Sequence, residues 1–348
     1  MSELFGSFKS DSVEGLIDEV NLSEWLDEKG RAVGQPLSCR RIAGGLSNES
    51  IGLERGEHRW VLRRPAQVAL QGADRGMQRE FRVLSALKGT PVPHPRAVAL
   101  CTDASVIGCA FYVMEFVEGF TSMSRLPNNF RSDPELRRSA ANSCMAALGE
   151  LAGVDWKNRG LEGYGKPEGF HERQVSRWLR QLDSYQARDL PEIREVGAWL
   201  SEHLPSDDAW SPGIMHGDYH SANVMLGHEA PGRVVAILDW ENATIGDPLL
   251  DLAGFLRMFE LSDWSTWSDR SEMIEHWEQH SGRRAPDLRY HSALSAFRLA
   301  VLLEGVYQRS LADRTRGNAE PMGAMVLDIA RQARAVIDAR AAGSQGRP

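Results

Sequence analysis

The chain has 348 residues, of which 42% are hydrophobic and 25% are charged, and its formal net charge is −8. This composition is typical of a soluble globular protein, and the length allows two lobes or subdomains. The acidic balance argues against a general nucleic-acid-binding protein, which needs a basic face to neutralise phosphates. No signal-peptide core and no stretch of ~20 apolar residues is apparent, so we expect a cytoplasmic protein without a membrane span.

The four cysteines show neither the CxxC pattern nor the spacing of a zinc site. They are Cys39, Cys101, Cys109 and Cys144. In a cytoplasmic protein such residues are expected to be reduced thiols that pack in the interior.

The first third of the chain is rich in predicted strands. Apolar periodicity predicts a helix over 11–29, strands over 38–43, 50–55 and 59–63, a helix over 77–87 and a dense strand region over 106–117. Prolines at 91, 93 and 95 end the second helix. Strands, one helix and then further strands is the order of a small kinase-type N-lobe.

The rest of the chain is predicted to be mostly helical. Helices are expected over 135–151, 173–187, 191–204, 249–259, 271–280, 289–311 and 321–341, with one strand-loop-strand unit over 214–239. The predicted organisation is therefore a helical extension (1–35), a strand-rich N-lobe (36–118), a helical C-lobe (119–341) and a loose tail (342–348).

Three side chains that carry oxygen ligands have a spacing suited to phosphoryl transfer. Asp218 and Asn223 lie in the loop sequence HGDYHSAN, and Asp239 follows the apolar run VVAIL. Asp218 could orient a hydroxyl and accept its proton, while Asn223 and Asp239 offer the hard oxygen ligands that Mg²⁺ prefers. Taken singly, Asp218 could also be a turn residue and Asp239 a buried aspartate that caps nearby backbone.

These motifs resemble a known family. The pattern H-x-D-x-x-x-x-N followed by D resembles the catalytic loop of the protein-kinase-like fold, and HGDYHSANVM with ILDWENATIGDPLLDLA resembles the aminoglycoside phosphotransferase family. The similarity is to the branch that also occurs fused to acyl-CoA dehydrogenases, and it runs from about residue 42 to 309. It implies an α+β, two-lobed fold with an antiparallel sheet and one main helix in the N-lobe. It also implies use of ATP and Mg²⁺, and a loop-organising role for His216.

The resemblance also indicates a nucleotide site. The loop containing Gly44, Gly45, Ser47 and Asn48 would cover phosphates, although it is not a G-x-G-x-x-G sequence. Arg63 stands where a kinase-like fold carries its phosphate-binding lysine, and its geometry differs from that of lysine. Glu80 is the expected ion-pair partner of this arginine, with a solvated helix charge as the alternative. The backbone groups of Glu115 and Val117 would contact the adenine edge.

The acceptor site is predicted on the segment RQVSRWLRQ. Arg173, Arg177 and Arg180 fall on one helical face near Trp178, and Arg298, Glu304, Tyr307 and Arg309 could border the same cleft. This face would suit an anionic or CoA-linked hydroxy compound better than a polycationic aminoglycoside. A solvated basic stripe beside a core tryptophan is the alternative interpretation.

The function that these observations favour is phosphoryl transfer from ATP to a hydroxyl of a small molecule. A nucleotide-binding regulatory module without catalysis is the first alternative. A metal-dependent hydrolase built on His216, Asp218 and His220 is the second, but it would need further short ligand motifs. The sequence does not identify the acceptor, the preference for ATP or GTP, or the oligomeric state.

Overall fold

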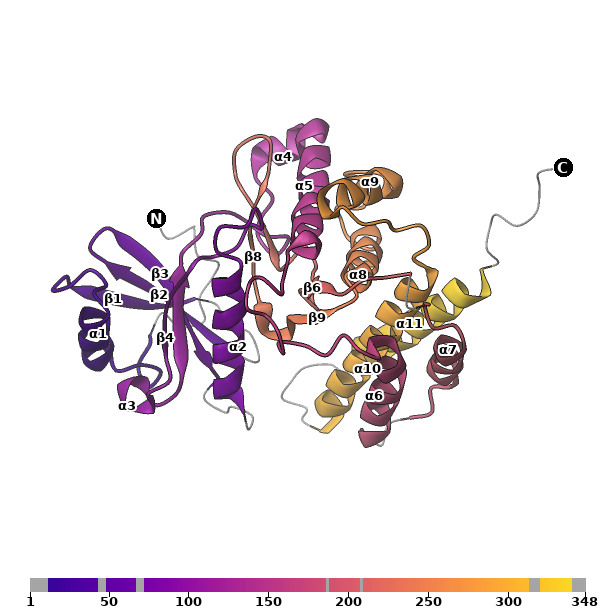
Figure 1. Ribbon diagram of the computed structural model, residues 1–348, viewed down its shortest axis with the longest axis horizontal. Coiled ribbons are helices and arrows are strands. Elements are labelled where there is room, and N and C mark those ends of the chain that lie inside the picture. The colour runs from indigo at the N-terminus through magenta and orange to yellow at the C-terminus, as the bar shows by residue number, and fades with distance from the viewer. Residues whose placement is uncertain are drawn as a thin grey trace. The chain divides into compact units, whose positions relative to one another are not determined.

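The computed structural model describes residues 12–42, 48–66, 72–185, 188–206, 209–312 and 320–339 (Figure 1). The chain forms two compact units. Unit 1 comprises Met1–Ala147, Asp155–Tyr164 and Ser221–Ala243, and unit 2 comprises Leu148–Val154, Gly165–His220 and Thr244–Pro348. The sheet-bearing and mainly helical parts confirm the α+β class predicted from the sequence. The predicted domain bounds and the function of each part stay predictions.

Unit 1 is built on a five-stranded antiparallel sheet with the order β1-β2-β3-β5-β4. The strands are β1 (Leu37–Ile42), β2 (Asn48–Arg55), β3 (His58–Pro65), β4 (Ala97–Cys101) and β5 (Phe111–Glu115). The helices α1 (Glu19–Glu28) and α2 (Ala73–Ala86) lie on opposite sides of this sheet (Figure 1). The sequence predicts α1, the strands β1 to β3, the helix α2 and the strand β5 in this order, but not β4 or the helix that follows it.

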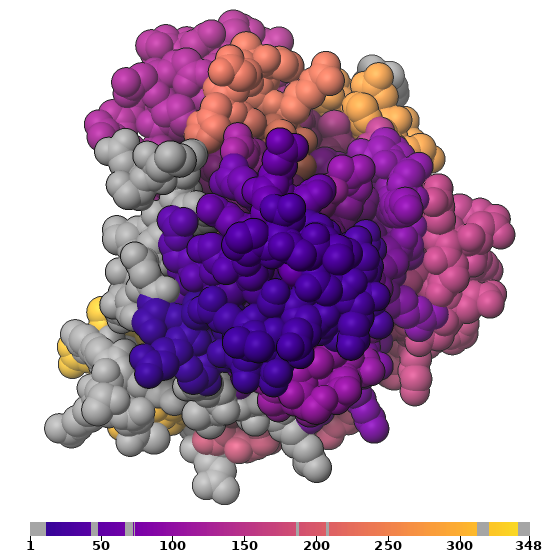
Figure 2. All heavy atoms as spheres, turned by 90° about the vertical axis from the view of Figure 1, so that its left-hand side faces the viewer, coloured from indigo at the N-terminus to yellow at the C-terminus, as the bar shows by residue number. Residues whose placement is uncertain are grey.

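The two faces of the sheet follow the alternation of its strands. Leu53 and Leu62 belong to one apolar cluster with Leu22 and Trp25 of α1, and all four side chains are buried. Figure 2 looks at unit 1 from the side on which α1 lies, and the indigo atoms there form one continuous surface. Residues of the opposite register, such as Arg63, face α2 and carry the polar groups described below.

Helix α1 starts later than predicted. The sequence periodicity favoured a helix from residue 11, but residues 14–16 form a turn and α1 begins at Glu19. The Asp18 carboxylate accepts hydrogen bonds from the N–H groups of Val20 and Asn21, both at 3.0 Å. An aspartate at this position satisfies two helix N–H groups that lack an intrahelical acceptor, so the cap fixes the first residue of the helix.

A buried arginine fastens α1 to the sheet. Arg55 is 1% exposed. Its guanidinium donates to the carbonyls of Gln35 and Ser23, both at 3.0 Å, and to a carboxylate oxygen of Asp27 at 2.6 Å. Ser23 and Asp27 lie in α1 and Gln35 lies in the segment between α1 and β1, so the N-terminal helix is tied to β2 by charge-assisted hydrogen bonds.

We expect Arg55→Leu to lower the free energy of unfolding by about 2–4 kcal/mol, because it leaves two carbonyls and a carboxylate without their donor. Arg40→Leu is the matched control, since the Arg40–Glu54 pair is 39% and 50% exposed and should contribute less than about 1 kcal/mol. Urea unfolding of both variants measures the difference. Equal midpoints would show that Arg55 does not anchor the helix.

The remainder of unit 1 contains a hairpin. Strands β7 (Val224–Leu226) and β8 (Val234–Ile237) pair antiparallel, with Val224 opposite Ile237. The short helix α4 (Asn128–Ser132) and the start of α5 (Pro134–Gly153) belong to the same unit. The Ser143 hydroxyl of α5 accepts the Val234 N–H at 2.9 Å, which joins the helix to the hairpin.

Unit 2 is mainly helical. Its helices are α6 (Phe170–Ser184), α7 (Pro191–Glu202), α8 (Leu249–Glu260), α9 (Arg270–Ser281), α10 (Arg289–Ala312) and α11 (Glu320–Asp338). One apolar cluster joins α6, α7, α8, α10 and α11 through side chains that include Trp178, Leu250 and Phe297. Strands β6 (Gly213–Met215) and β9 (Thr244–Gly246) pair as a two-stranded ribbon. Along the chain, β9 follows the 3₁₀ turn η1 (Trp240–Asn242), which belongs to unit 1, and precedes α8.

Two local predictions for unit 1 were wrong. The segment predicted as one strand over 106–117 begins within the helix α3 (Ala104–Ile107), and only Phe111–Glu115 is a strand. Asp103 caps this helix through the Ser105 N–H at 2.9 Å, and Gly108 ends it with φ +87°. Strand β4 had no counterpart in the prediction.

The remaining predictions concern the cysteines and membrane spans. Cys101 and Cys144 are buried, and none of the four cysteines, all of which lie in the described residues, forms a disulfide. Burial raises the pKa of the Cys144 thiol to about 12. Among the helices of the described residues, none combines the length and apolarity needed to cross a bilayer.

Candidate functional site

The hairpin of unit 1 brings the two predicted metal ligands to the same end. Asn223 precedes β7 and Asp239 follows β8, and the Asn223 carbonyl accepts the Leu238 N–H at 2.8 Å. Asp239 has φ +64°, a left-handed conformation that aspartate tolerates better than most residues. Backbone in this region is found disproportionately at functional sites. The pairing therefore places the two residues at the same end of the hairpin, and an amide and a carboxylate are oxygen donors of the kind that Mg²⁺ takes.

Arg63 of β3 connects this end of the hairpin to α2. Its Nη2 lies 2.9 Å from Asp239 Oδ1, and its Nε lies 3.5 Å from Glu80 Oε2. The Tyr112 hydroxyl donates to the same Glu80 oxygen at 2.7 Å. The Arg63–Glu80 ion pair predicted from the sequence is therefore present, and Arg63 has a second partner, Asp239, that the sequence did not suggest.

Burial governs the protonation of this cluster. It raises the pKa of the Glu80 carboxyl, although the Arg63 guanidinium and the Tyr112 hydroxyl act in the opposite direction. Burial by itself would lower the pKa of Arg63, but Tyr112, Glu80 and Asp239 outweigh it and the net shift is upward. Arg63 therefore stays charged in a site where its side chain is only 13% exposed.

A pocket of about 160 Å³ lies in unit 1 with Arg63 and Asp239 at its wall. The rest of its lining is largely apolar: Ile42, Val61, Pro95, Met114, Phe116, Val117, Met225, Leu238 and Trp240, with Ser50, Tyr112 and Glu115. An apolar pocket with a few polar groups is the usual form of a small-molecule site. Three of the residues predicted for the nucleotide, Arg63, Glu115 and Val117, line this pocket.

The Glu115 backbone is already partly engaged. Its N–H donates to the Arg96 carbonyl at 2.9 Å, and its carboxylate pairs with the Arg96 guanidinium at 2.6 Å. Any contact of Glu115 with a base would therefore use its carbonyl, as a backbone contact that does not depend on the side chain.

The glycine loop can be followed only in part. Gly44, Gly45 and Ser47 lie outside the described residues. Asn48 is described, and its amide donates to Glu241 Oε2 at 3.0 Å and to Glu80 Oε1 at 3.4 Å. In this structure the Asn48 side chain thus contacts two carboxylates.

In unit 2, the loop that carries Asp218 is held by a buried carboxylate of α8. Asp251 Oδ2 accepts the His216 N–H at 2.6 Å, and Oδ1 accepts the Gly217 N–H at 3.0 Å. Gly217 has φ +82°, and the His216 side chain is fully buried. These bonds fix the backbone immediately before Asp218, so Asp251 acts as a positioning residue for this loop.

The Asp218 carboxylate lies in a mixed electrostatic environment. Burial acts to raise the pKa of Asp218, but His220, whose Nε2 lies 3.5 Å from Asp218 Oδ2, His216 and Arg298 together hold it below its usual value. Asp218 is therefore ionised at neutral pH, which is the state required of a proton acceptor.

The buried Asp251 gives the protein a measurable pH dependence. Burial raises the pKa of Asp251 to about 6, against the hydrogen bonds from His216 and Gly217. The native state then binds this proton more tightly than the unfolded chain, so the contribution of Asp251 to stability falls as pH rises from about 4 to about 6 and is constant above. We expect the free energy of unfolding of wild type, relative to Asp251→Asn, to fall by roughly 3 kcal/mol across that window. Urea unfolding at a series of pH values tests this, and parallel profiles would contradict it.

A second buried carboxylate stabilises the start of α8. Asp247 Oδ2 lies 3.0 Å from His171 Nε2 and 2.7 Å from His291 Nε2, and Oδ1 accepts the Leu249 N–H at 3.1 Å. These three side chains could in principle hold a metal ion. The hydrogen bonds already satisfy both carboxylate oxygens, so the capping role predicted for Asp247 accounts for the arrangement.

The predicted acceptor residues do not converge on Asp218. Arg173 donates to the carbonyls of Lys166 and Glu168 beside its own helix. Arg177 lies over the Trp178 ring at 5.2 Å, and the Tyr307 ring faces Arg188 at 4.6 Å. None of the four residues proposed from the sequence (Arg173, Arg177, Trp178 and Tyr307) lines the cavity described next.

Asp218 lines a cavity of about 220 Å³ that is formed by its own loop, α8 and α10. Two arginines, Arg257 and Arg298, are in the lining. Arg298 was predicted from the sequence as a border residue of the acceptor cleft, whereas Arg257 was not predicted. One signal was available, because Gly254, Arg257 and Met258 follow Asp251 at helical spacing and hence share its face.

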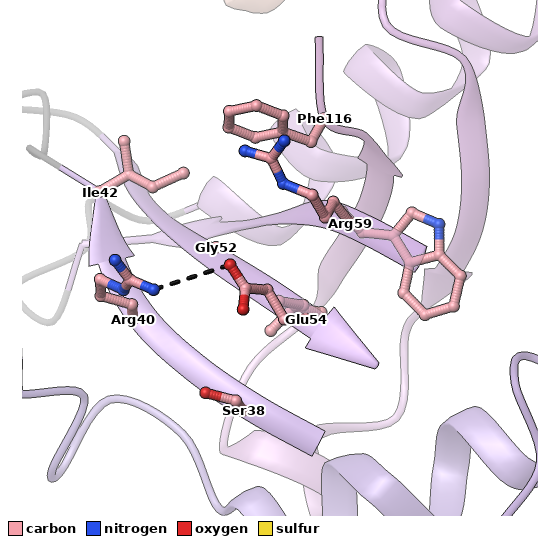
Figure 3. Close-up of a pocket in the computed structure, with 9 residues that line it drawn as sticks. Ser38, Arg40, Ile42, Gly52, Glu54, Arg59 and Phe116 are labelled. Atoms are coloured by element: carbon pink, nitrogen blue, oxygen red, sulfur yellow. Dashed lines mark ion pairs between the residues drawn. The ribbon is translucent and has the colours of Figure 1, made fainter. Parts of the chain in front are cut away.

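A third hollow, on the sheet of unit 1, is too small for a ligand. Figure 3 shows Ser38, Arg40, Ile42 and Glu54 on one side, with the Arg40–Glu54 ion pair, and Arg59 beside Phe116 on the other. Its volume is about 10 Å³, close to the lower limit for a single water.

The five-stranded antiparallel sheet, the Arg63–Glu80 pair and the two loops with Asp218 and Asp239 define the class as a protein-kinase-like phosphotransferase fold. The chain belongs to the phosphotransferase enzyme family (APH), whose model matches residues 38–290. The similarity to this family inferred from the two motifs is thus confirmed.

The chain is similar to acyl-CoA dehydrogenase family member 11 from Gallus gallus, with 34% identity over 297 residues. This match covers 79% of the chain but only 37% of the relative. Among solved structures, a protein from Ralstonia eutropha described as a candidate aminoglycoside phosphotransferase is 29% identical, with a TM-score of 0.81 over 92% of this chain and 98% of that one. An aminoglycoside phosphotransferase in complex with GDP and kanamycin shares the fold, with 15% identity and a TM-score of 0.60 over 91% and 99% of the two chains.

Proposed function

We propose that this chain transfers the γ-phosphate of ATP, with Mg²⁺ as cofactor, to a hydroxyl group of a small molecule. The observation that carries the proposal is the position of Arg63 at the wall of the apolar pocket of unit 1, between Glu80 and Asp239. A base fits the apolar lining, and a cation aligned by two carboxylates suits the phosphate end of a nucleotide.

In this proposal the residues have separate roles. Arg63 neutralises phosphate charge and is aligned by Glu80, while the carbonyl of Glu115 and the N–H of Val117 contact the base. Asn223 and Asp239 would hold Mg²⁺, which supplies charge neutralisation and alignment of the phosphates. Asp218 orients the acceptor hydroxyl and takes its proton. Catalysis then consists of positioning and electrostatic stabilisation, with no covalent intermediate on the protein.

Related proteins support nucleotide use. The complex of an aminoglycoside phosphotransferase with GDP and kanamycin shows that this fold accommodates a nucleotide and a hydroxylated acceptor in that protein. For the present chain, the choice between ATP and GTP is part of the test. The glycine loop of residues 44–48 would cover the phosphates in the same proposal.

Calorimetric titration with ATP, with GTP and with Mg²⁺ present or absent tests the nucleotide site. We expect Arg63→Gln to weaken ATP binding about tenfold or more, because charge-assisted hydrogen bonds to phosphate are lost. Arg63→Lys keeps the charge without the planar fork and should fall between that variant and wild type. Arg40→Gln, on an exposed pair of the same sheet, should bind ATP as wild type does.

The outcome also separates the two functional classes. Nucleotide binding followed by Mg²⁺-dependent ADP formation supports a phosphotransferase. Binding without any ADP formation, even with a panel of hydroxylated acceptors, would instead support a nucleotide-binding regulatory module. Failure of both ATP and GTP to bind would overturn the proposal.

A further inference from the structure

The cavity beside Asp218 has a composition that points to the chemistry of its ligand. It is bounded by the loop of Asp218, by α8 and by α10, all of which belong to unit 2. Its volume of about 220 Å³ is enough for a small organic molecule or for one part of a larger one. The proposed transfer reaction assigns no ligand to the two arginines in its wall, Arg257 and Arg298.

Arg257 of α8 has donors without acceptors. Its Nε and Nη1 are shielded from solvent and have no hydrogen-bond partner within the described part of the chain. Burial lowers the pKa of its guanidinium, and the one compensating charge is the carboxylate of Glu260. Shielded donors of a charged group that lack a partner are destabilising. Their presence in a cavity wall therefore calls for a ligand that accepts them.

Arg298 of α10 is held in a fixed position by an aromatic ring. Its guanidinium lies over Trp178 at 5.4 Å, and the Trp178 N–H donates to Gln174 at 3.3 Å. The Nε of Arg298 is also shielded and, among the residues that the structure describes, has no hydrogen-bond partner. Asp251 and Asp218 influence it as nearby charges, but neither forms an ion pair with it in the described residues.

Another part of the lining is apolar. Leu250, Met258, Leu299 and Leu302 contribute to it, and Met258 and Leu302 are 39% and 43% exposed. Exposed apolar side chains beside two arginines form an amphipathic wall. A ligand that fits it has an anionic group at one end and an apolar segment next to it.

We propose that the phosphate acceptor is anionic, with Arg257 and Arg298 binding a carboxylate or phosphate group of the acceptor while its apolar segment contacts Met258 and Leu302. The identification of the bound anion as the phosphate acceptor rests on the proposed function, in which Asp218 is the base, because Asp218 lines the same cavity. It also moves the anion site from the α6 face expected from the sequence to α8 and α10. Arg173 is bound to loop carbonyls and is not available for that role.

Binding of three matched probes to the full chain tests this assignment. Hexyl phosphate, hexanoate and 1-hexanol share an apolar segment and differ in the head group. We expect at least one of the two anions to bind about tenfold or more tightly than the alcohol. The comparison of the two anions tells a phosphate site from a carboxylate site. Affinities within twofold for all three probes would overturn the proposal.

Variants then locate the site. Arg257→Gln and Arg298→Gln should each weaken binding of the preferred anion about tenfold, whereas Arg180→Gln, an exposed arginine of α6, should leave it unchanged. Circular dichroism checks that the variants fold. If Arg298→Gln perturbs α10, Arg298→Lys replaces it as the test. Lysine keeps the charge, so this variant should retain part of the affinity. Wild-type affinity in both glutamine variants would overturn the assignment.

The test is independent of the nucleotide site. Anion binding that depends on the two arginines, in a chain that binds neither ATP nor GTP, would refute the proposed function and keep the anion site. ATP-dependent phosphorylation without any preference for anionic probes would refute the anion site and keep the proposed function.

Discussion

Replacing Asp218 with asparagine is expected to lower turnover about 10²–10⁴-fold, because asparagine keeps the size and hydrogen-bonding shape of the side chain but cannot accept a proton. His220, His216 and Arg298 hold the pKa of Asp218 low against the opposing effect of burial, so the wild-type carboxylate is ready to accept a proton at neutral pH. ADP formation from ATP, first with water and then with acceptors that the wild type phosphorylates, measures the effect.

The Asp218 variant needs two controls. Asp263→Asn changes an exposed aspartate of the same unit and should have wild-type turnover. Asp218→Asn should also bind ATP with wild-type affinity, because the pocket proposed for the nucleotide is lined by other residues. Turnover above about one tenth of wild type in a folded Asp218→Asn protein would show that Asp218 is not the base.

Asp239→Asn is expected to reduce turnover about 10²–10³-fold and to raise the Mg²⁺ concentration at half-maximal activity, because a metal site that loses a carboxylate loses several kcal/mol of charge stabilisation. Asparagine tolerates the left-handed backbone that Asp239 adopts with φ +64°, so the fold should be retained. A Mg²⁺ titration of initial rates, at saturating ATP, measures both effects.

Asp239→Asn also removes an ion-pair partner of Arg63. A second variant separates this loss from the loss of the proposed metal ligand. Glu80→Gln takes away the other carboxylate beside Arg63 without touching the proposed metal ligands. We expect it to weaken ATP affinity and to leave the Mg²⁺ midpoint unchanged. A common shift of the midpoint in both variants would mean that Asp239 acts only through Arg63.

Local periodicity predicted the secondary structure well where one face of an element is buried. Helix α2 has Met77, Leu84 and Leu87 on its buried side, and the helical spacing of these residues was visible in the sequence. The region 106–117 is apolar throughout, so periodicity could not distinguish the short helix α3 from the strand that follows it. Strand β4 was missed because its existence depends on pairing with β5, which is not encoded in its own five residues.

The candidate site was predictable to different degrees. Asp218, Asn223 and Asp239 are separated by short loops and strands, so their spacing suggested a common catalytic role, which stays a prediction. The structure shows that Asn223 and Asp239 flank one hairpin. The Arg63–Asp239 contact joins residues 176 positions apart and had no local signal. The basic face of α6 looked suitable for an anion, yet Arg173 satisfies its guanidinium within its own loop.

The sequence by itself determined the reaction chemistry that we propose, because the base and the metal ligands lie on short segments whose spacing constrains them. Tertiary structure alone decided which cations reach the cavity next to Asp218. Arg257 and Arg298 stand on different helices, and only the packing of α8 against α10 brings both guanidiniums into one wall. The same packing shields their donors from solvent, and burial is a property of the folded unit that no helical periodicity specifies.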